Sequence, residues 1–281
     1  MNAPLRPTGK LPFWEMVGRA YALPLEHAGA IVQMTWAWAL ILAVGTGALY
    51  SLLDAAQLAA IQRGEGLGPA SLNLVSLLTG LIVGSSVAVG WHRLLLLGEP
   101  QGGGAYLRLD NTVWRYIAVA GLMLLISLPF LAAAFLMSQL TPDLAARADN
   151  PPAEVAGWMG LLFIVLLGAM VLAFLLTTRL SLVLPARAID DMVLTLGDSW
   201  RLTQGNFWRL FAGTLACYLP TLVLGGIIAS LAGGEGNGSG TFILSTMLSS
   251  VAGLVTSVVP LGFLSLAYKQ LVSRAAGFAI D

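Results

Sequence analysis

The chain has 281 residues, of which 57% are hydrophobic and only 10% are charged, and its formal net charge is zero. A soluble domain carries about 25% charged residues, so this composition excludes an ordinary water-facing surface and indicates a polytopic membrane protein. The balanced charge also argues against binding to nucleic acid, and no polybasic run points to anionic lipid head groups.

Residues 1–27 lack an apolar core long enough for a signal peptide. The hydrophobic run that follows is too long for a cleaved signal, so we expect it to be an uncleaved signal anchor. The stretch "LPFWEMVGRAYALPLEH" sets apolar and charged side chains on opposite helical faces, which predicts an interfacial helix. We therefore divide the chain into an interfacial segment (1–27), a transmembrane domain (28–268) and a tail (269–281).

Six runs are long and apolar enough to span a bilayer, which takes about 20 mostly apolar residues. None carries a charge through its middle, and Arg179, near the end of the fourth run, is the nearest exception. The predicted fold is thus an all-α membrane bundle of six helices with interfacial amphipathic helices. The predicted spans are 28–53, 71–91, 116–140, 157–184, 210–232 and 241–268.

The basic residues are distributed unevenly along the chain. Of the 14 Lys and Arg residues, the first, third and fifth loops carry only Arg63 and Arg147. The N-terminus, the second and fourth loops and the C-terminus carry all the others. Because basic residues favour the cytoplasmic side, we expect a bacterial inner-membrane protein with both termini in the cytoplasm.

The fourth loop carries the most distinctive pattern. Apolar residues recur with helical spacing over 186–201, opposite a charged face that includes Asp190 and Asp191. This pattern predicts one amphipathic helix in the interface, with Gly197 as a candidate break and a solvated role for the two carboxylates. Gly205 and Asn206 then form a turn, and Asn206 is a candidate N-cap for the fifth span.

Two Trp-Arg pairs flank that turn: Trp200-Arg201 and Trp208-Arg209. Trp rings favour the headgroup level, and Arg extends its apolar stem along lipid while its charge reaches phosphate or water. We interpret the pairs as anchors that hold the loop and the next span at one depth. Binding of a lipid or another anion by the same residues is the alternative.

An internal repeat is suggested by the ends of three spans: "VAVGWHRLLLLGE", "FLLTTRLSLVLPA" and "LSLAYKQLVSRAA". Each has an apolar run, one basic residue (Arg93, Arg179 or Lys269) and a second apolar group. The starts "NTVWRYIAVAG" and "GNFWRLFAGTL" also correspond. We predict three parallel helix-hairpin repeats, whereas inverted repeats would favour an alternating-access transporter.

The three cations at the repeat ends are candidates for a basic ring on the inner-leaflet side. Such a ring would suit a lipid phosphate, or the carboxylates of Glu99, Asp190 or Asp198, and simple interfacial anchoring is the third reading. Small residues mark candidate helix contacts. These are Gly80 and Gly84 in the second span, and Ser249 and Gly253 in the last.

Residues for catalysis or metal binding are scarce. His27 and His92 lie far apart and Cys217 is the single cysteine, so we expect no metal, no cofactor and no intramolecular disulfide. No nucleophile elbow, phosphate loop or dinucleotide fingerprint is present. Intramembrane ionisable groups, which usually mark coupled transport, are absent from the middle of every predicted span.

Three stretches, "WHRLLLLGE", "TRLSLVLPARAID" and "SWRLTQGNFWRLF", resemble motifs of uncharacterised alphaproteobacterial six-span proteins. These are similar to the YciC-like bacterial inner-membrane family and, more distantly, to the membrane domain of glycerophosphoryl diester phosphodiesterases. The resemblance covers residues 85–281 best. It implies an all-helical membrane module with no assigned activity, and the soluble catalytic domain of the phosphodiesterases is absent.

Two functions follow from these observations. We expect a non-enzymatic scaffold, assembly or regulatory module of a membrane complex, with membrane lipids and a membrane-protein partner as its contacts. The alternative is a transporter or lipid translocator with a polar cavity between the repeats, which Ser249 or Thr256 would face. A membrane enzyme is the least favoured function because no cleft of titratable residues is evident.

Overall fold

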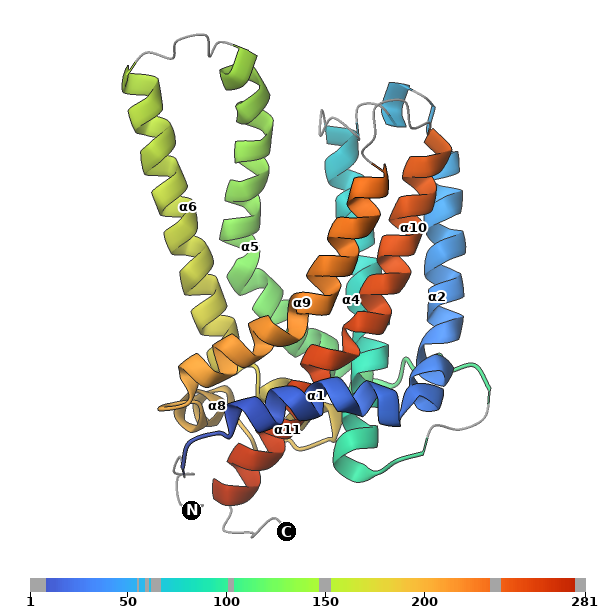
Figure 1. Ribbon diagram of the computed structural model, residues 1–281, viewed down its shortest axis with the longest axis vertical. Coiled ribbons are helices and arrows are strands. Elements are labelled where there is room, and N and C mark those ends of the chain that lie inside the picture. The colour runs from blue at the N-terminus through green and yellow to red at the C-terminus, as the bar shows by residue number, and fades with distance from the viewer. Residues whose placement is uncertain are drawn as a thin grey trace.

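The computed structural model describes residues 9–54, 56–58, 61, 67–100, 104–146, 153–232 and 239–275. The regular elements of this part are all α-helices, which confirms the predicted all-α class (Figure 1). In chain order they are α1 (Phe13–Glu26), α2 (Ala28–Ser51), α4 (Leu67–Leu97), α5 (Asn111–Ala146), α6 (Ala153–Leu180), α7 (Val183–Ala188), α8 (Leu196–Leu202), α9 (Phe207–Ala232), α10 (Ser239–Thr256) and α11 (Val258–Ala275).

Six stretches are long and apolar enough to cross a membrane, as the sequence predicts. The third begins at Asn111, five residues before the predicted start, because Asp110 caps it: its carboxylate accepts a hydrogen bond from the Val113 amide at 3.1 Å. The last is interrupted at Ser257, where α10 ends and α11 begins. The spans are Ala28–Ser51, Leu74–Leu97, Asn111–Phe130, Gly160–Leu180, Phe207–Ser230 and Gly240–Val272.

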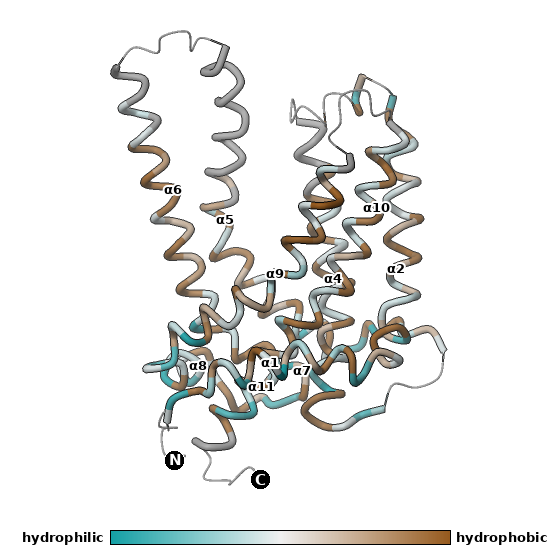
Figure 2. Tube along the Cα trace, in the orientation of Figure 1, coloured by the Kyte–Doolittle hydropathy of each residue, from teal (hydrophilic) through white to brown (hydrophobic). Residues whose placement is uncertain are grey.

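The helices stand on a common layer, here called the base, which comprises α1, α7, α8, α11 and the adjoining ends of the spans (Figure 1). From the base, α2, α4, α9 and α10 rise as one group and α5 and α6 as a separate hairpin, and the two groups diverge with distance from it. Hydrophilic residues gather at the base, while the spans are mostly apolar (Figure 2).

The largest part of the packed core lies in the base. Its largest cluster joins α1, α4, α9 and α11 through fully buried side chains such as Trp91, Leu210 and Phe263. By contrast, only 6% of the α6 span is buried inside the protein. A smaller buried cluster joins α2, α4 and α10 within the spans: Trp38, Val83, Val87 and Leu254. Because lipid tails solvate apolar helices as well as other helices do, the α5–α6 hairpin depends mainly on its contacts at the base.

The N-terminal helix α1 is part of this layer. It packs against α11 and α9, and the Tyr21 hydroxyl donates to the Ala216 carbonyl of α9 at 2.7 Å. Asn206, the predicted N-cap, uses its side chain differently: it accepts from the Leu11 amide at 2.8 Å and donates to the Gly9 carbonyl at 3.0 Å. The Asn206 amide group therefore holds the N-terminal segment on the base.

The prediction of one amphipathic helix over 186–201 is wrong. Helix α7 ends at Ala188, an irregular segment follows, and α8 starts at Leu196. Asp190 has φ of 58°, a left-handed conformation that Asp tolerates better than most residues. The Thr195 side chain caps α8 in a capping box with Asp198, so Gly197 lies inside a helix instead of ending one.

The closest helix contacts lie at glycines other than the predicted ones. A Cβ at Gly90 would overlap the Tyr106 ring, and one at Gly213 would overlap the ring of Phe263. At Gly80, Gly84 and Gly253 an added Cβ meets no atom within 4 Å, and Ser249 is exposed. Among the described residues, therefore, no tight contact is found at these four predicted positions.

Candidate functional site

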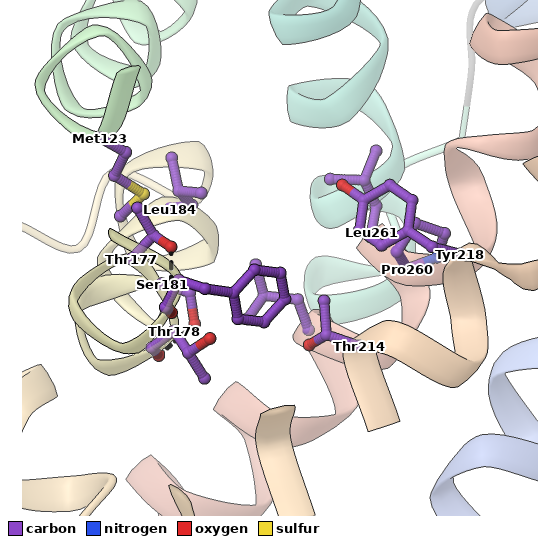
Figure 3. Close-up of a pocket in the computed structure, with 11 residues that line it drawn as sticks. Met123, Thr177, Thr178, Ser181, Leu184, Thr214, Tyr218, Pro260 and Leu261 are labelled. Carbon is purple, nitrogen blue, oxygen red and sulfur yellow. Dashed lines mark hydrogen bonds between the residues drawn. The ribbon is translucent and has the colours of Figure 1, made fainter. Parts of the chain in front are cut away.

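A cavity of about 210 Å³ lies where the α5–α6 hairpin meets α9 and α11 (Figure 3). Its apolar lining includes Met123 from α5, Phe174 from α6 and Leu261 from α11. Phe174 stacks edge-on against Phe211 of α9, with ring centroids 4.6 Å apart. The two helix groups therefore meet through aromatic packing beside the cavity.

Five hydroxyl side chains line the same cavity: Thr177, Thr178, Ser181, Thr214 and Tyr218. Those of Thr177 and Ser181 donate to carbonyls of their own helix, at 2.9 Å each, and their oxygens retain lone pairs that can accept. The hydroxyls of Thr178, Thr214 and Tyr218 make no hydrogen bond within the described part of the chain. In Figure 3 Tyr218 lies across the space from Thr177, Thr178 and Ser181.

Two further cavities adjoin the first around α4. One of about 460 Å³ lies between α4, α5 and α6 and shares Met123 and Thr177 with it. The other, of about 300 Å³ between α2, α4 and α10, shares Ser76 with the second. The residues that line the three cavities are all uncharged, so the cavities suit apolar groups and neutral polar groups but not an unpaired charge.

The hydroxyl run of the last span contributes little to these cavities. Ser250 lines the one beside α2, whereas Ser249 does not. The Thr221 hydroxyl donates to the Thr256 hydroxyl at 2.8 Å, which joins α9 to α10. Thr256 in turn donates to the Ala252 carbonyl of its own helix at 2.8 Å. Neither Ser249 nor Thr256 faces a described cavity.

An ionic network in the base centres on Arg93, whose side chain is 14% exposed. Its guanidinium donates to Glu99 at 2.7 Å, to Asp190 at 2.9 Å and to the Ala188 carbonyl at 3.1 Å. Thr112 donates to the same Asp190 at 3.0 Å. The hydrogen bond from Arg93 holds the pKa of Glu99 below its ordinary value. The sequence left three roles open for Arg93: a lipid phosphate, nearby carboxylates or simple anchoring. In the structure Arg93 pairs with the carboxylates of Glu99 and Asp190.

Asp191 is the centre of a second network. Its carboxylate accepts from the Tyr268 hydroxyl at 2.7 Å and from the Val193 amide at 2.9 Å. Arg187 donates to the Asp191 and Leu194 carbonyls. Asp190 is 43% exposed, as a solvated face predicts. The structure adds partners that the pattern did not indicate: Asp190 and Asp191 tie the irregular segment to different helices, because the left-handed turn at Asp190 separates their side chains.

His92 lies between these networks, fully buried. Its Nδ1 is 2.7 Å from the Ser265 hydroxyl and its Nε2 is 3.4 Å from the Tyr116 hydroxyl. These contacts join α4 to α5 and α11. Since both ring nitrogens face protein hydroxyls, the imidazole joins helices of the core and is closed to a ligand. The described residues contain no group of three or more His, Cys, Asp or Glu that could hold a metal ion.

The remaining predicted contact residues lie at the base in separate environments. Arg209 donates to the Leu11 carbonyl at 2.7 Å, and Arg201 pairs with Asp198 at 2.8 Å. Trp208 is 73% exposed, and Lys269 is exposed on α11. Arg179 lies against two aromatic rings, of which one is Trp200. Arg93 and Arg179 thus face different partners and do not form one ring.

The cavity residues escaped the sequence analysis, although part of their signal is present. Thr177 and Thr178 lie in the last turn of α6 and Ser181 directly follows it, while Thr214 and Tyr218 share one face of α9. Hydroxyls at such spacing in a membrane helix usually bond their own backbone. Only the packing of α6 against α9 distinguishes these five from other hydroxyls in the spans.

Comparison with known proteins identifies no relative: no protein-family model, no curated protein and no solved structure matches the chain. The resemblance to the YciC-like family therefore stays a prediction.

Proposed function

We propose that the protein is a non-enzymatic integral membrane protein that binds a bilayer lipid, with an acyl chain and its neutral ester region in the cavity between α5, α6, α9 and α11. The observation that carries this proposal is the lining of that cavity: an apolar wall with three hydroxyls, those of Thr178, Thr214 and Tyr218, that have no hydrogen-bond partner in the described part of the chain. Of the two functions that the sequence left open, this supports the lipid translocator.

The side chains that line the cavity indicate which kind of ligand it can bind. Of the three residues whose hydroxyls have no partner in the described part of the chain, Thr178 is buried, Thr214 is half-buried and Tyr218 is 44% exposed. Hydroxyls on an otherwise apolar wall can pair with a ligand that supplies hydrogen-bond acceptors or donors, and ester carbonyls supply acceptors. The residues of all three cavities are uncharged, which disfavours an ion or a charged solute because a charge there would be unpaired. The cavity between α4, α5 and α6 shares Met123 and Thr177 with the first cavity and is the neighbouring space in which an acyl chain could extend.

We further propose that the base faces the cytoplasm, in the bacterial inner membrane. Arg19, Arg93, Arg108, Arg179 and Arg209 belong to the base, where Figure 2 shows the hydrophilic residues gathering. This distribution supports the positive-inside orientation. The cavity would then lie just above the cytoplasmic interface, where a lipid of the inner leaflet has its ester groups.

The test fills the cavity with a bulky side chain. Thr214→Trp places an indole in the cavity, and Leu215→Trp is the matched control because Leu215 is the next residue of α9 and is exposed. Each purified variant is photolabelled in nanodiscs with a phospholipid that carries a diazirine in its acyl chain. The proposal predicts labelling of α6 and α9 peptides around the cavity in the wild type and in Leu215→Trp, and its loss in Thr214→Trp.

Equal labelling of the cavity peptides in both variants would contradict the proposal. A lipid-translocation assay in vesicles, with a fluorescent lipid and an externally added quencher, then separates binding from transport. Faster appearance of the lipid in the other leaflet with the wild type than with Thr214→Trp supports a translocator. Identical rates restrict the function to lipid binding.

A scaffold role is the second candidate, and the α5–α6 hairpin favours it. The hairpin diverges from the other spans above the base (Figure 1), and large apolar side chains along α6 are exposed, including Trp158, Phe163 and Ile164. A partner helix could pack on this face. Extraction into polymer nanodiscs followed by mass spectrometry tests it: a stoichiometric protein partner that is lost in a Phe163→Ser/Ile164→Ser variant supports the scaffold.

A further inference from the structure

Arg179 has an unusual environment at the corner of the base where α6 ends beside α8 and the start of α9. Its guanidinium carbon lies over the Trp200 ring, 5.0 Å from the centroid, and 5.3 Å from the centroid of Phe207. Within the described part of the chain, the guanidinium makes one hydrogen bond, which is long, 3.5 Å to the Trp200 carbonyl, and its Nε is buried without a partner. A guanidinium offers five N–H donors, so the described residues use little of its capacity.

No carboxylate of the described residues pairs with Arg179, which sets it apart from Arg93, Arg115 and Arg201. The nearest acidic residue in the neighbouring helix α8, Asp198, is already engaged. One of its oxygens accepts from Arg201 at 2.8 Å, and the other accepts from the Thr195 amide and hydroxyl, at 3.0 and 2.6 Å. The positive charge of Arg179 therefore has no counter-ion among the residues that the structure describes, although the side chain is partly buried.

The surroundings place this cation at a lipid headgroup. Trp208, the second residue of the fifth span, is 73% exposed, and exposed Trp side chains concentrate at the level of lipid head groups. Arg179 is the next-to-last residue of the fourth span. It does not line the cavity, whereas its neighbour Thr178 does, so the corner is a separate site on another side of α6.

We propose that Arg179, with Trp200 and Phe207, binds the phosphate group of an anionic inner-leaflet phospholipid. The rings hold the guanidinium in place and shield it from water, and its terminal N–H groups donate to phosphate oxygens. Arg suits this role because its planar fork matches two oxygens of a phosphate, which an ammonium group does not. The site adds a phosphate contact to the base that does not depend on the cavity.

The experiment measures lipid binding to detergent-purified protein by native mass spectrometry. The probes are phosphatidylglycerol, diacylglycerol with the same chains, and inorganic phosphate alone. Arg179→Gln should weaken phosphatidylglycerol binding about tenfold or more and leave diacylglycerol binding unchanged. Arg19→Gln is the control, because it removes one exposed cation of α1 that pairs with Glu26, and it should bind both lipids as the wild type does.

Three outcomes decide the proposal. Equal phosphatidylglycerol binding by Arg179→Gln and the wild type overturns it, as does an equal loss in Arg19→Gln, which would indicate general electrostatic attraction. Binding of inorganic phosphate that Arg179→Gln abolishes supports the phosphate site but identifies a free phosphate compound as the ligand.

Hydrogen exchange on the wild type provides a second measurement that does not depend on a variant. Phosphatidylglycerol should slow exchange of the amides of α8 and of the turn to Phe207, relative to diacylglycerol. Unchanged exchange in this segment overturns the proposal even if Arg179→Gln fails to fold.

Discussion

Gly213 is the position at which the smallest change should do the most damage. It lies in α9 against α11, and a Cβ added there would overlap the ring of Phe263. That ring is 1% exposed and belongs to the main core cluster, so it has no free space into which to move. Gly213→Ala therefore forces α9 and α11 apart at the centre of the base.

The expected cost follows from two opposing effects. Inserting a methyl group into a packed core destabilises by about 1–3 kcal/mol, and the better helix propensity of Ala than of Gly offsets up to about 1 kcal/mol. The net loss is about 1–2 kcal/mol in the free energy of unfolding. For a chain of this size, that corresponds to a decrease in Tm of about 2–8 °C.

Cys217 provides the assay. It is the single cysteine of the chain, it is fully buried, and it lies one helical turn from Gly213. A thiol-reactive dye therefore reports the unfolding of the base during a thermal ramp in detergent. Gly225→Ala is the matched control, because it makes the same substitution in the same helix where an added Cβ meets no atom within 4 Å. If Gly213→Ala unfolds at the same temperature as Gly225→Ala, the assigned role of the Gly213–Phe263 contact is wrong.

Three other perturbations test the base. The pKa of Glu99 is lowered in the folded protein, so its pairing with Arg93 stabilises the fold above the ordinary glutamate pKa of about 4.3, and this contribution is lost as the pH falls through the lower folded-state value. In thermal ramps between pH 6 and 3, Glu99→Gln should therefore show a smaller acid-induced decrease in Tm than the wild type. Parallel curves for the two proteins would contradict the pairing. Asn206→Ala removes both side-chain hydrogen bonds to the N-terminal segment and should speed limited proteolysis before α1 at least several-fold, whereas an unchanged cleavage rate would show that α1 alone holds the segment. Tyr268→Phe leaves the Asp191 carboxylate with one fewer donor and should cost about 1–2 kcal/mol in the free energy of unfolding, measured by the same thermal ramp; a Tm within error of the wild type would show that water replaces the hydroxyl.

The pattern of apolar residues over 186–201 led to a wrong prediction of one continuous helix. Apolar spacing alone favours a continuous helix, but Asp190 and Asp191 bond to residues far away in the chain, Arg93 and Tyr268. These long-range bonds stabilise the left-handed turn at Asp190, which a local pattern cannot reveal. The capping box of α8 was visible in part, since Thr195 precedes Asp198 by three residues.

The six spans, the helical class and the concentration of basic residues at one end were determined by the sequence itself. They follow from composition over windows of about 20 residues, because every backbone polar group in a bilayer must be satisfied within the segment. That prediction does not require knowing which side chains contact one another.

Which charges are paired, and which hydroxyls are not, was decided only by the tertiary structure. Arg93 and Arg179 look alike at the ends of their spans, yet one meets two carboxylates and the other meets two aromatic rings. Likewise, Thr178 and Tyr218 line one cavity because α6 and α9 converge at the base. Hydropathy is a property of each segment, whereas a site depends on the directions in which side chains of different segments point once the core of the base has packed.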